Sequence, residues 1–215
     1  QVVWGNTGLG SLDTAAGNPG QSADHPGGTD NIRSFTAFSP TATEHLRLTG
    51  QMFDDASSAN KRMSIGLRNS NSTNIIEMGF YNSPAHYAAR VVLFASGNPS
   101  PSWVAFPNLT PPPAVLSTPV AGWHTFSVEI SDTTVDFSLD LGSDGTIDST
   151  MNFTSTAGPS GFNELRIGGP SSLSSAGGGA KFDNLLLETV SVPEPTSAGL
   201  CVLLGCLGLV RRRRR

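Results

Sequence analysis

Short stretches in which apolar and polar residues alternate recur along most of the chain. In residues 126–130 and 135–141 every second residue is apolar. Successive side chains of a β-strand point to opposite faces, so this period of two predicts strands that bury one face. Further strands are predicted at residues 32–37, 46–49, 63–68, 76–80, 87–94, 147–153, 164–167 and 181–190. No comparable helical stripe occurs before residue 190.

Clusters of Gly, Pro, Asn and Ser separate these stretches, and Asp144-Gly145 is typical of a tight hairpin. Residues 5–30 and 96–119 lack the alternation and are expected to be long surface loops. About ten or eleven short strands in residues 1–190 predict an all-β fold in which two antiparallel sheets pack face to face as a β-sandwich.

Composition agrees with this fold class and narrows the partners. Charged residues make up 14% of the chain, against roughly 25% in an average soluble protein. The formal charge is −4, although the chain ends in five arginines, Arg211–Arg215. The remainder is therefore strongly acidic, which argues against nucleic acid as a partner. Both cysteines, Cys201 and Cys206, lie near the C-terminus, so the body has no thiol for a disulfide, a zinc site or a nucleophile.

Residues 191–215 form a separate segment with three parts in fixed order. Pro193-Glu194-Pro195 comes first, an apolar run at 198–210 follows, and the arginines end the chain. The prolines keep Glu194 in an extended, accessible segment. The apolar run predicts a short hydrophobic helix, shorter than the roughly 20 residues that cross a bilayer squarely. The arginines resist translocation, so this end is expected on the cytoplasmic side and the body outside it.

This arrangement resembles the PEP-CTERM sorting signal of exported bacterial proteins. The resemblance implies that an exosortase, a membrane enzyme similar to transpeptidases, recognises Pro193, Glu194 and Pro195. The hydrophobic helix would then be a transient membrane anchor, and cleavage would pass the body to the cell surface or the exopolysaccharide matrix. A permanent tail anchor is the alternative. A chain that begins with Gln1 rather than Met is also expected of a protein whose export signal has been removed.

The body resembles concanavalin A-like, or laminin-G-like, jelly-roll domains. The resemblance is carried by four stretches, residues 123–126, 135–148, 165–171 and 182–185. Domains of this kind bind carbohydrates, proteins or neither. We therefore expect a non-catalytic exported protein of the cell surface or matrix with weak carbohydrate binding. The alternative is a secreted polysaccharide-active enzyme, a hydrolase or a lyase, on the same fold.

Sugar binding usually needs an aromatic face flanked by amide and carboxylate side chains. The candidates are Trp103, Tyr81, Tyr87 and Trp123, with Trp103 favoured because it lies in the proline-rich stretch. For Trp123 and Trp103 the alternative is an anchor of the sheet or of the loop.

Candidate chemistry beyond sugar binding is sparse. The Glu-x-Asp-x-x-Glu pattern of glucanases is absent, and His86, Tyr87 and Arg90 are the nearest approach to a lyase site. No catalytic residue is therefore assigned. The spacing of the acids at 140, 144 and 148 is similar to that of a calcium-binding loop. Position 12 of such a loop would be Met151, which cannot supply a carboxylate, so a hairpin explains the stretch equally well. No other cofactor is expected.

Overall fold

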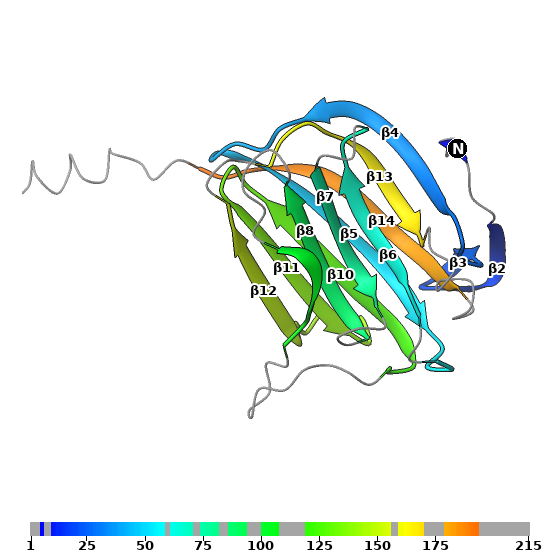
Figure 1. Ribbon diagram of the computed structural model, residues 1–215. Coiled ribbons are helices and arrows are strands. Elements are labelled where there is room, and N and C mark those ends of the chain that lie inside the picture. Colours follow the sequence, from blue (N-terminus) through cyan, green and yellow to red (C-terminus); the bar gives the residue numbers. More distant parts are fainter. Residues whose placement is uncertain are drawn as a thin grey trace, which may run out of the picture.

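The computed structural model describes residues 5–6, 10–58, 61–70, 74–81, 86–93, 100–107, 119–155, 159–169 and 179–193. These residues form fourteen strands and no helix (Figure 1). The strands are β1 (Gly5–Asn6), β2 (Ser11–Gly17), β3 (Gly20–His25), β4 (Asp30–Phe38), β5 (Glu44–Asp54), β6 (Met63–Arg68), β7 (Asn74–Phe80), β8 (Tyr87–Leu93), β9 (Ser100–Ala105), β10 (Gly122–Ile130), β11 (Thr134–Leu141), β12 (Ser149–Thr154), β13 (Phe162–Gly168) and β14 (Ala180–Ser191).

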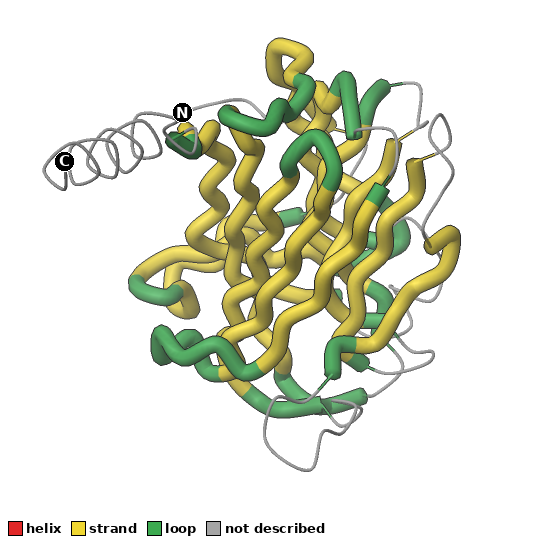
Figure 2. Tube along the Cα trace, turned by 90° about the vertical axis from the view of Figure 1, so that its left-hand side faces the viewer, coloured by secondary structure: helices red, strands yellow, loops and turns green. Residues whose placement is uncertain are grey.

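The strands form two seven-stranded antiparallel sheets. Sheet A has the order β1-β4-β13-β6-β7-β8-β9, and sheet B has the order β12-β11-β10-β5-β14-β3-β2. The two sheets lie face to face, with turns and loops at their ends (Figure 2). The predicted all-β sandwich of two antiparallel sheets is confirmed. The hydrophobic helix predicted within residues 191–215 lies outside the described residues.

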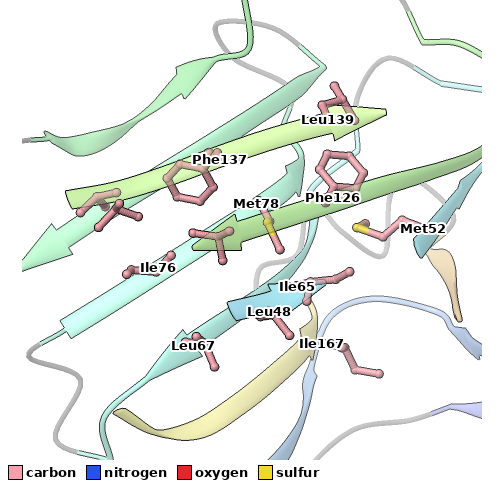
Figure 3. Packing of buried hydrophobic residues seen from close by; sticks show 14 of the residues in the cluster. Leu48, Met52, Ile65, Leu67, Ile76, Met78, Phe126, Phe137, Leu139 and Ile167 are labelled. Atoms are coloured by element: carbon pink, nitrogen blue, oxygen red, sulfur yellow. The ribbon is translucent and has the colours of Figure 1, made fainter. Parts of the chain in front are cut away.

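The core lies between the sheets and is built from the alternating positions. Leu48 and Met52 on β5 face Ile65 on β6 and Met78 on β7, and all four side chains are fully buried (Figure 3). Burying a side chain of this size stabilises a fold by roughly 1.5–3 kcal/mol. The inward faces of sequentially distant strands thus provide the main stabilising interaction.

The strand predicted at residues 76–80 differs from the half-buried strand that its alternation indicates. Every residue of β7 is buried, including Glu77, which is 5% exposed on the face turned away from the core. A carboxylate tolerates this burial because two guanidinium groups lie against it. The outer face of sheet A is therefore partly covered at β7.

Two of the predicted loops contain strands, and the prediction was wrong there. Residues 5–30 include β2 and β3, which form an antiparallel pair at the edge of sheet B, and residues 96–119 include β9 at the edge of sheet A. The residues of β2 are mostly exposed or half-exposed, without a buried face. An edge strand held by backbone hydrogen bonds needs no apolar alternation, so its sequence resembles that of a loop.

The last strand, β14, ends at Ser191, and the described residues end at Pro193. Glu194 and Pro195 of the expected sorting motif, the apolar run and the arginines lie outside the described residues. Within the described ranges, no helix has the length and hydropathy to span a membrane.

Candidate functional site

Two of the four aromatic candidates stack on each other at the outer face of sheet A. Tyr81 directly follows β7, and Trp103 lies in β9. Their ring centroids are 4.9 Å apart and the rings are nearly parallel, at 13°. The guanidinium carbon of Arg62 lies 5.3 Å from the centroid of the Tyr81 ring, within the range of a cation–π contact. Trp103 is 8% exposed, so the stack is a partly covered element of the surface.

The other two aromatic candidates lie elsewhere. Tyr87 is fully buried on the inner face of β8, and its hydroxyl donates to a carboxylate oxygen of Asp54 at 3.0 Å. Its ring therefore presents no stacking surface to solvent, and burial raises the pKa of its hydroxyl. Trp123 lies on the outer face of sheet B, tilted against Phe53 with centroids 5.4 Å apart. The structure thus brings Tyr81 and Trp103 together and separates Tyr87 and Trp123 from them.

A charged cluster lies on the same outer face of sheet A. Strand register places Glu77 on β7 directly between Gly66 on β6 and Arg90 on β8. Arg68, two residues after Gly66, donates a hydrogen bond to Glu77, and a terminal nitrogen of Arg90 lies 3.8 Å from the other Glu77 oxygen. We call Arg68, Glu77 and Arg90 the guanidinium cluster.

Gly66 makes room for this cluster. A Cβ atom at this position would lie 2.5 Å from the carbonyl oxygen of Ile76 and 2.9 Å from Cγ of Glu77. Real Cβ contacts are longer than this, so any larger residue would displace the Glu77 side chain or the backbone of β7. The sequence needs glycine here because the Glu77 side chain lies across β6.

Several N–H donors of this face have no acceptor among the described residues. They are Nε of Arg68, Nε of Arg90 and the indole Nε1 of Trp103. Pairing between β8 and β9 is irregular, so Arg90 lies opposite residues 101–103, between the regular pairs Ala89–Val104 and Val91–Ser100. A buried donor without an acceptor costs about 1–3 kcal/mol. All three atoms are buried, so a ligand that supplies acceptor atoms would pair with them only after side chains on this face shift.

The neighbouring part of sheet A is charged but satisfied. Arg166 on β13 contacts Asp30 at 2.6 Å and Glu164 at 3.2 Å. Its two carboxylate partners leave Arg166 little capacity for a further ligand. The part of the face with unused donors is therefore the one formed by β6 to β9.

A buried polar network lies inside one end of the sandwich. His86 Nε2 is 2.7 Å from a carboxylate oxygen of Asp54, and Lys61 pairs with the other oxygen at 3.5 Å. All three side chains are at most 2% exposed. Burial opposes the charge on Asp54, but hydrogen bonds from His86 and from the backbone N–H of Ala56, with the Lys61 charge, outweigh it and lower its pKa.

His124 joins the same network as a neutral ring. Its Nε2–H donates to the carbonyl oxygen of Val120 at 2.7 Å, and its Nδ1 accepts the N–H of Gly142 at 3.0 Å. Burial lowers the pKa of His124, and a proton on Nδ1 would oppose the N–H of Gly142. The network ties β5, β8 and β10 together and has a structural role. The strand pattern alone did not reveal this network, although Asp54 and His124 occupy inward positions of strands whose other inward residues are mostly apolar.

The nearest approach to a lyase site is not assembled. His86 and Tyr87 belong to the buried network, whereas Arg90 lies on the outer face of sheet A. The three side chains therefore do not converge on one accessible groove.

The three acids considered for calcium serve the turn between β11 and β12. Asp140 accepts the N–H groups of Asp144 at 3.1 Å and Gly145 at 2.9 Å, and Asp148 accepts the N–H of Leu141 at 2.7 Å. The carboxylate of Asp144 accepts the N–H of Thr146 at 2.8 Å. In the described part of the chain, no group of three His, Cys, Asp or Glu residues is arranged to hold a metal ion.

A groove of about 400 Å³ on sheet B contains two carboxylates on neighbouring strands. Glu129 on β10 pairs directly with Asp136 on β11, and Cβ atoms of such a pair lie about 4.5–5.5 Å apart. A glycosidase needs one carboxyl group of its pair to be protonated. Hydrogen bonds from His45 and Arg47 instead lower the pKa of Glu129. The carboxylate is thereby held in its ionised form, which suits an ion pair better than a general acid.

A wider cleft of about 760 Å³ opens between the sheets, at β4 and β13 on one side and β2, β3 and β14 on the other. Its lining is mainly apolar, including Phe35, Ile167, Phe182 and Leu185. Carbohydrates bind through many hydroxyl groups, and the polar side chains of this lining, Gln21, Ser22, Asn31, Arg33, Asp183 and Asn184, are fewer than its apolar ones. The outer face of sheet A is therefore the better candidate for a sugar site.

Comparison with known protein families finds no match, and no curated protein matches the chain in sequence. Solved structures share the fold. The exoplasmic/lumenal domain of VIP36 in its Ca²⁺/Man-bound form has a TM-score of 0.51 and 11% identity, over 87% of this chain and 84% of that one. A functionally unknown protein from Saccharomyces cerevisiae has a TM-score of 0.50 and 13% identity, over 89% and 96% of the two chains.

The carbohydrate binding module CBM66 from Bacillus subtilis is also similar, with a TM-score of 0.48 and 10% identity over 84% of this chain and 92% of that one. The likeness to the VIP36 domain, at a TM-score of 0.51, shows that the fold is the lectin-type jelly-roll sandwich. At such low identities a shared fold does not specify the ligand.

Proposed function

We propose that the body of this protein is a non-catalytic carbohydrate-binding domain whose site is the outer face of sheet A at β6 to β9. The observation that carries the proposal is the pair of neighbouring groups with unused donors. Within the described ranges, Arg90 makes only a 3.8 Å ion pair and the indole N–H of Trp103 has no acceptor. Hydroxyl and carboxylate oxygens of a glycan are suitable acceptors for both.

The fold supports this proposal without specifying the ligand. The VIP36 domain was solved with Ca²⁺ and Man bound, so a jelly-roll sandwich of this kind can carry such a ligand. In this chain the aromatic contribution would come from the Trp103 edge rather than from a broad platform, because one face of the Tyr81 ring is stacked on Trp103.

The absence of catalysis is part of the proposal. Glu77 is the carboxylate of the guanidinium cluster, and it is held between Arg68 and Arg90. An ion-paired carboxylate with no second carboxyl group in that cluster offers no acid and base pair for glycoside hydrolysis. The alternative, a hydrolase, would have to use Glu129 and Asp136 on sheet B.

An array of glycans, probed with the 215-residue chain with and without calcium, tests the binding function. Reducing-sugar release from the same polymers is measured in parallel. Binding without sugar release, weakened by Trp103→Phe and unchanged by Trp123→Phe on the opposite sheet, supports the proposal. Release of reducing ends by the wild-type protein but not by Glu129→Gln would reject the binding proposal in favour of a hydrolase.

We further propose that residues 191–215 deliver this domain outside the cytoplasm. Pro193, Glu194 and Pro195 would be recognised by an exosortase, and the following apolar run would anchor the chain transiently in the inner membrane. The domain would then reach the cell surface or the exopolysaccharide matrix, where a glycan-binding face has a ligand. The proposal is supported by the order of motif, apolar run and arginines at this end of the sequence.

Mass spectrometry of the protein isolated from its native host tests the delivery. Loss of the C-terminal arginines, abolished when Glu194 is replaced by Gln, is the expected result. A mature protein that keeps Arg211–Arg215 would contradict processing and leave the binding proposal untouched.

A further inference from the structure

The charges on the outer face of sheet A are unbalanced in one direction. The strands of this sheet carry three acidic residues, Asp30, Glu77 and Glu164. Asp30 and Glu164 both contact Arg166. Glu77 alone remains for Arg68 and Arg90.

Arg62 holds a further guanidinium over the Tyr81 ring, at the opposite end of β6 from Arg68. The segments 71–73, 82–85, 94–99 and 108–118, which connect or flank these strands, contain no Asp or Glu. Arg68 and Arg90 therefore share one carboxylate, that of Glu77, and no acid in these segments can balance them. The whole chain is acidic, at a net charge of −4, so this local excess of positive charge is opposite in sign to the rest of the protein.

The two arginines of the cluster differ in their hydrogen bonding. Arg68 donates to Glu77, whereas Arg90 lies 3.8 Å from that carboxylate, too far for a hydrogen bond. The Arg90 side chain is 21% exposed, so ligands can reach part of it, although its Nε atom is buried. A planar guanidinium with unused N–H groups matches a carboxylate with two parallel hydrogen bonds, a fit that a neutral hydroxyl group cannot reproduce.

From these observations we propose that the ligand is an acidic polysaccharide, and that Arg90 binds the carboxylate of a uronate residue beside the indole N–H of Trp103. This inference rests on the proposed carbohydrate-binding function and specifies its ligand class. A uronate carboxylate supplies the second negative charge that Arg68 and Arg90 lack, and the ring and hydroxyl oxygens of the sugar supply acceptors for neighbouring donors. A neutral glycan would leave the excess positive charge of the cluster uncompensated in a partly covered site.

The test compares polygalacturonate with the same polymer after its carboxyl groups have been reduced to alcohols. Binding of the 215-residue chain is measured by isothermal titration calorimetry at low and high salt. We expect polygalacturonate to bind at least about tenfold more tightly than the reduced polymer. Tenfold corresponds to the lower end of the free energy that a hydrogen bond to a charged group contributes. This preference should shrink as salt screens the charges.

Arg90→Gln is expected to remove the preference for the acidic polymer. Arg33→Gln is the matched control, because Arg33 is exposed, lines the cleft between the sheets and loses the same charge on substitution. Circular dichroism of both variants shows whether they fold. Equal binding of both polymers, or equal losses in the two folded variants, would overturn the inference and leave carbohydrate binding intact. Binding of neither polymer, together with a blank glycan array, would reject the proposed function itself.

Discussion

Replacing Asp54 by alanine should destabilise this protein more than any surface substitution. The carboxylate is fully buried and accepts hydrogen bonds from His86 at 2.7 Å, from Tyr87 at 3.0 Å and from the N–H of Ala56 at 2.9 Å. It also pairs with Lys61 at 3.5 Å, whose ammonium group is 2% exposed. Its removal takes a buried acceptor away from His86, Tyr87 and the N–H of Ala56, and leaves Lys61 with Asp55 as its carboxylate partner.

Removing one partner of a buried ion pair costs about 3–5 kcal/mol. In a domain of this size, 1 kcal/mol corresponds to a shift in Tm of about 2–4 °C. Asp54→Ala should therefore lower Tm by roughly 6–20 °C. The measurement is thermal and urea unfolding of the 215-residue chain, followed by circular dichroism.

Asp55→Ala is the matched control. Asp55 contacts the same Lys61 ammonium group, but its side chain is 53% exposed. Hydrogen bonds and the Lys61 charge outweigh desolvation and lower the pKa of Asp55 to about 2. Solvent screens an exposed pair, so its loss should cost less than about 1 kcal/mol. A similar loss of stability in both variants, or less than about 1 kcal/mol for Asp54→Ala, would refute the role assigned to the buried network.

Three further predictions concern pH, the sheet A face and the indole. Burial lowers the pKa of His25 and His124 in the folded protein below the ordinary 6.5. Near pH 6, the unfolded chain therefore binds more protons at these two residues than the folded protein does. The free energy of unfolding should fall as pH drops below about 6.5. Urea titrations at pH 7.5 and pH 5.5 measure it, and a higher free energy of unfolding at pH 5.5 than at pH 7.5 would contradict this prediction. Gly66→Ala should lower the free energy of unfolding by roughly 1–3 kcal/mol, because the Cβ of the new alanine would contact Glu77. The same contact should weaken glycan binding. An unchanged glycan affinity by calorimetry, in a variant that folds, would count against the site. Trp103→Phe should weaken glycan binding about threefold to tenfold, with Tm nearly unchanged, because it removes one N–H donor and keeps a ring on Tyr81.

The central strands could be predicted from sequence because burial of one face imposes a period of two. β10 follows this period from Phe126 to Ile130 and β11 follows it from Val135 to Leu139, with Phe126 and Phe137 pointing inward. The edge strands β2 and β9 could not be found in this way, because backbone hydrogen bonds to a single neighbour hold them and their sequences lack an apolar alternation.

The candidate site was only half visible in the sequence. Tyr81 and Trp103 stood out as aromatic residues, but their stacking depends on the placement of β9 beside β8, which no local pattern encodes. Glu77, Arg68 and Arg90 lie on three strands, and their contact follows from the register between hairpins. A one-residue change of that register would turn Glu77 inward, so strand periodicity alone cannot reveal the cluster.

The unused donors on sheet A, Trp103 Nε1–H and Arg90 Nε–H, are proposed to bind glycan oxygens, and side-chain NMR observes these two N–H groups directly. Titration of the ¹⁵N-labelled chain with oligogalacturonate should shift the indole Nε1–H resonance of Trp103 and the Nε–H resonance of Arg90. The indole resonance of Trp123, on the opposite sheet, should stay in place. Shifts at Trp123 with none at Trp103 or Arg90 would contradict the account.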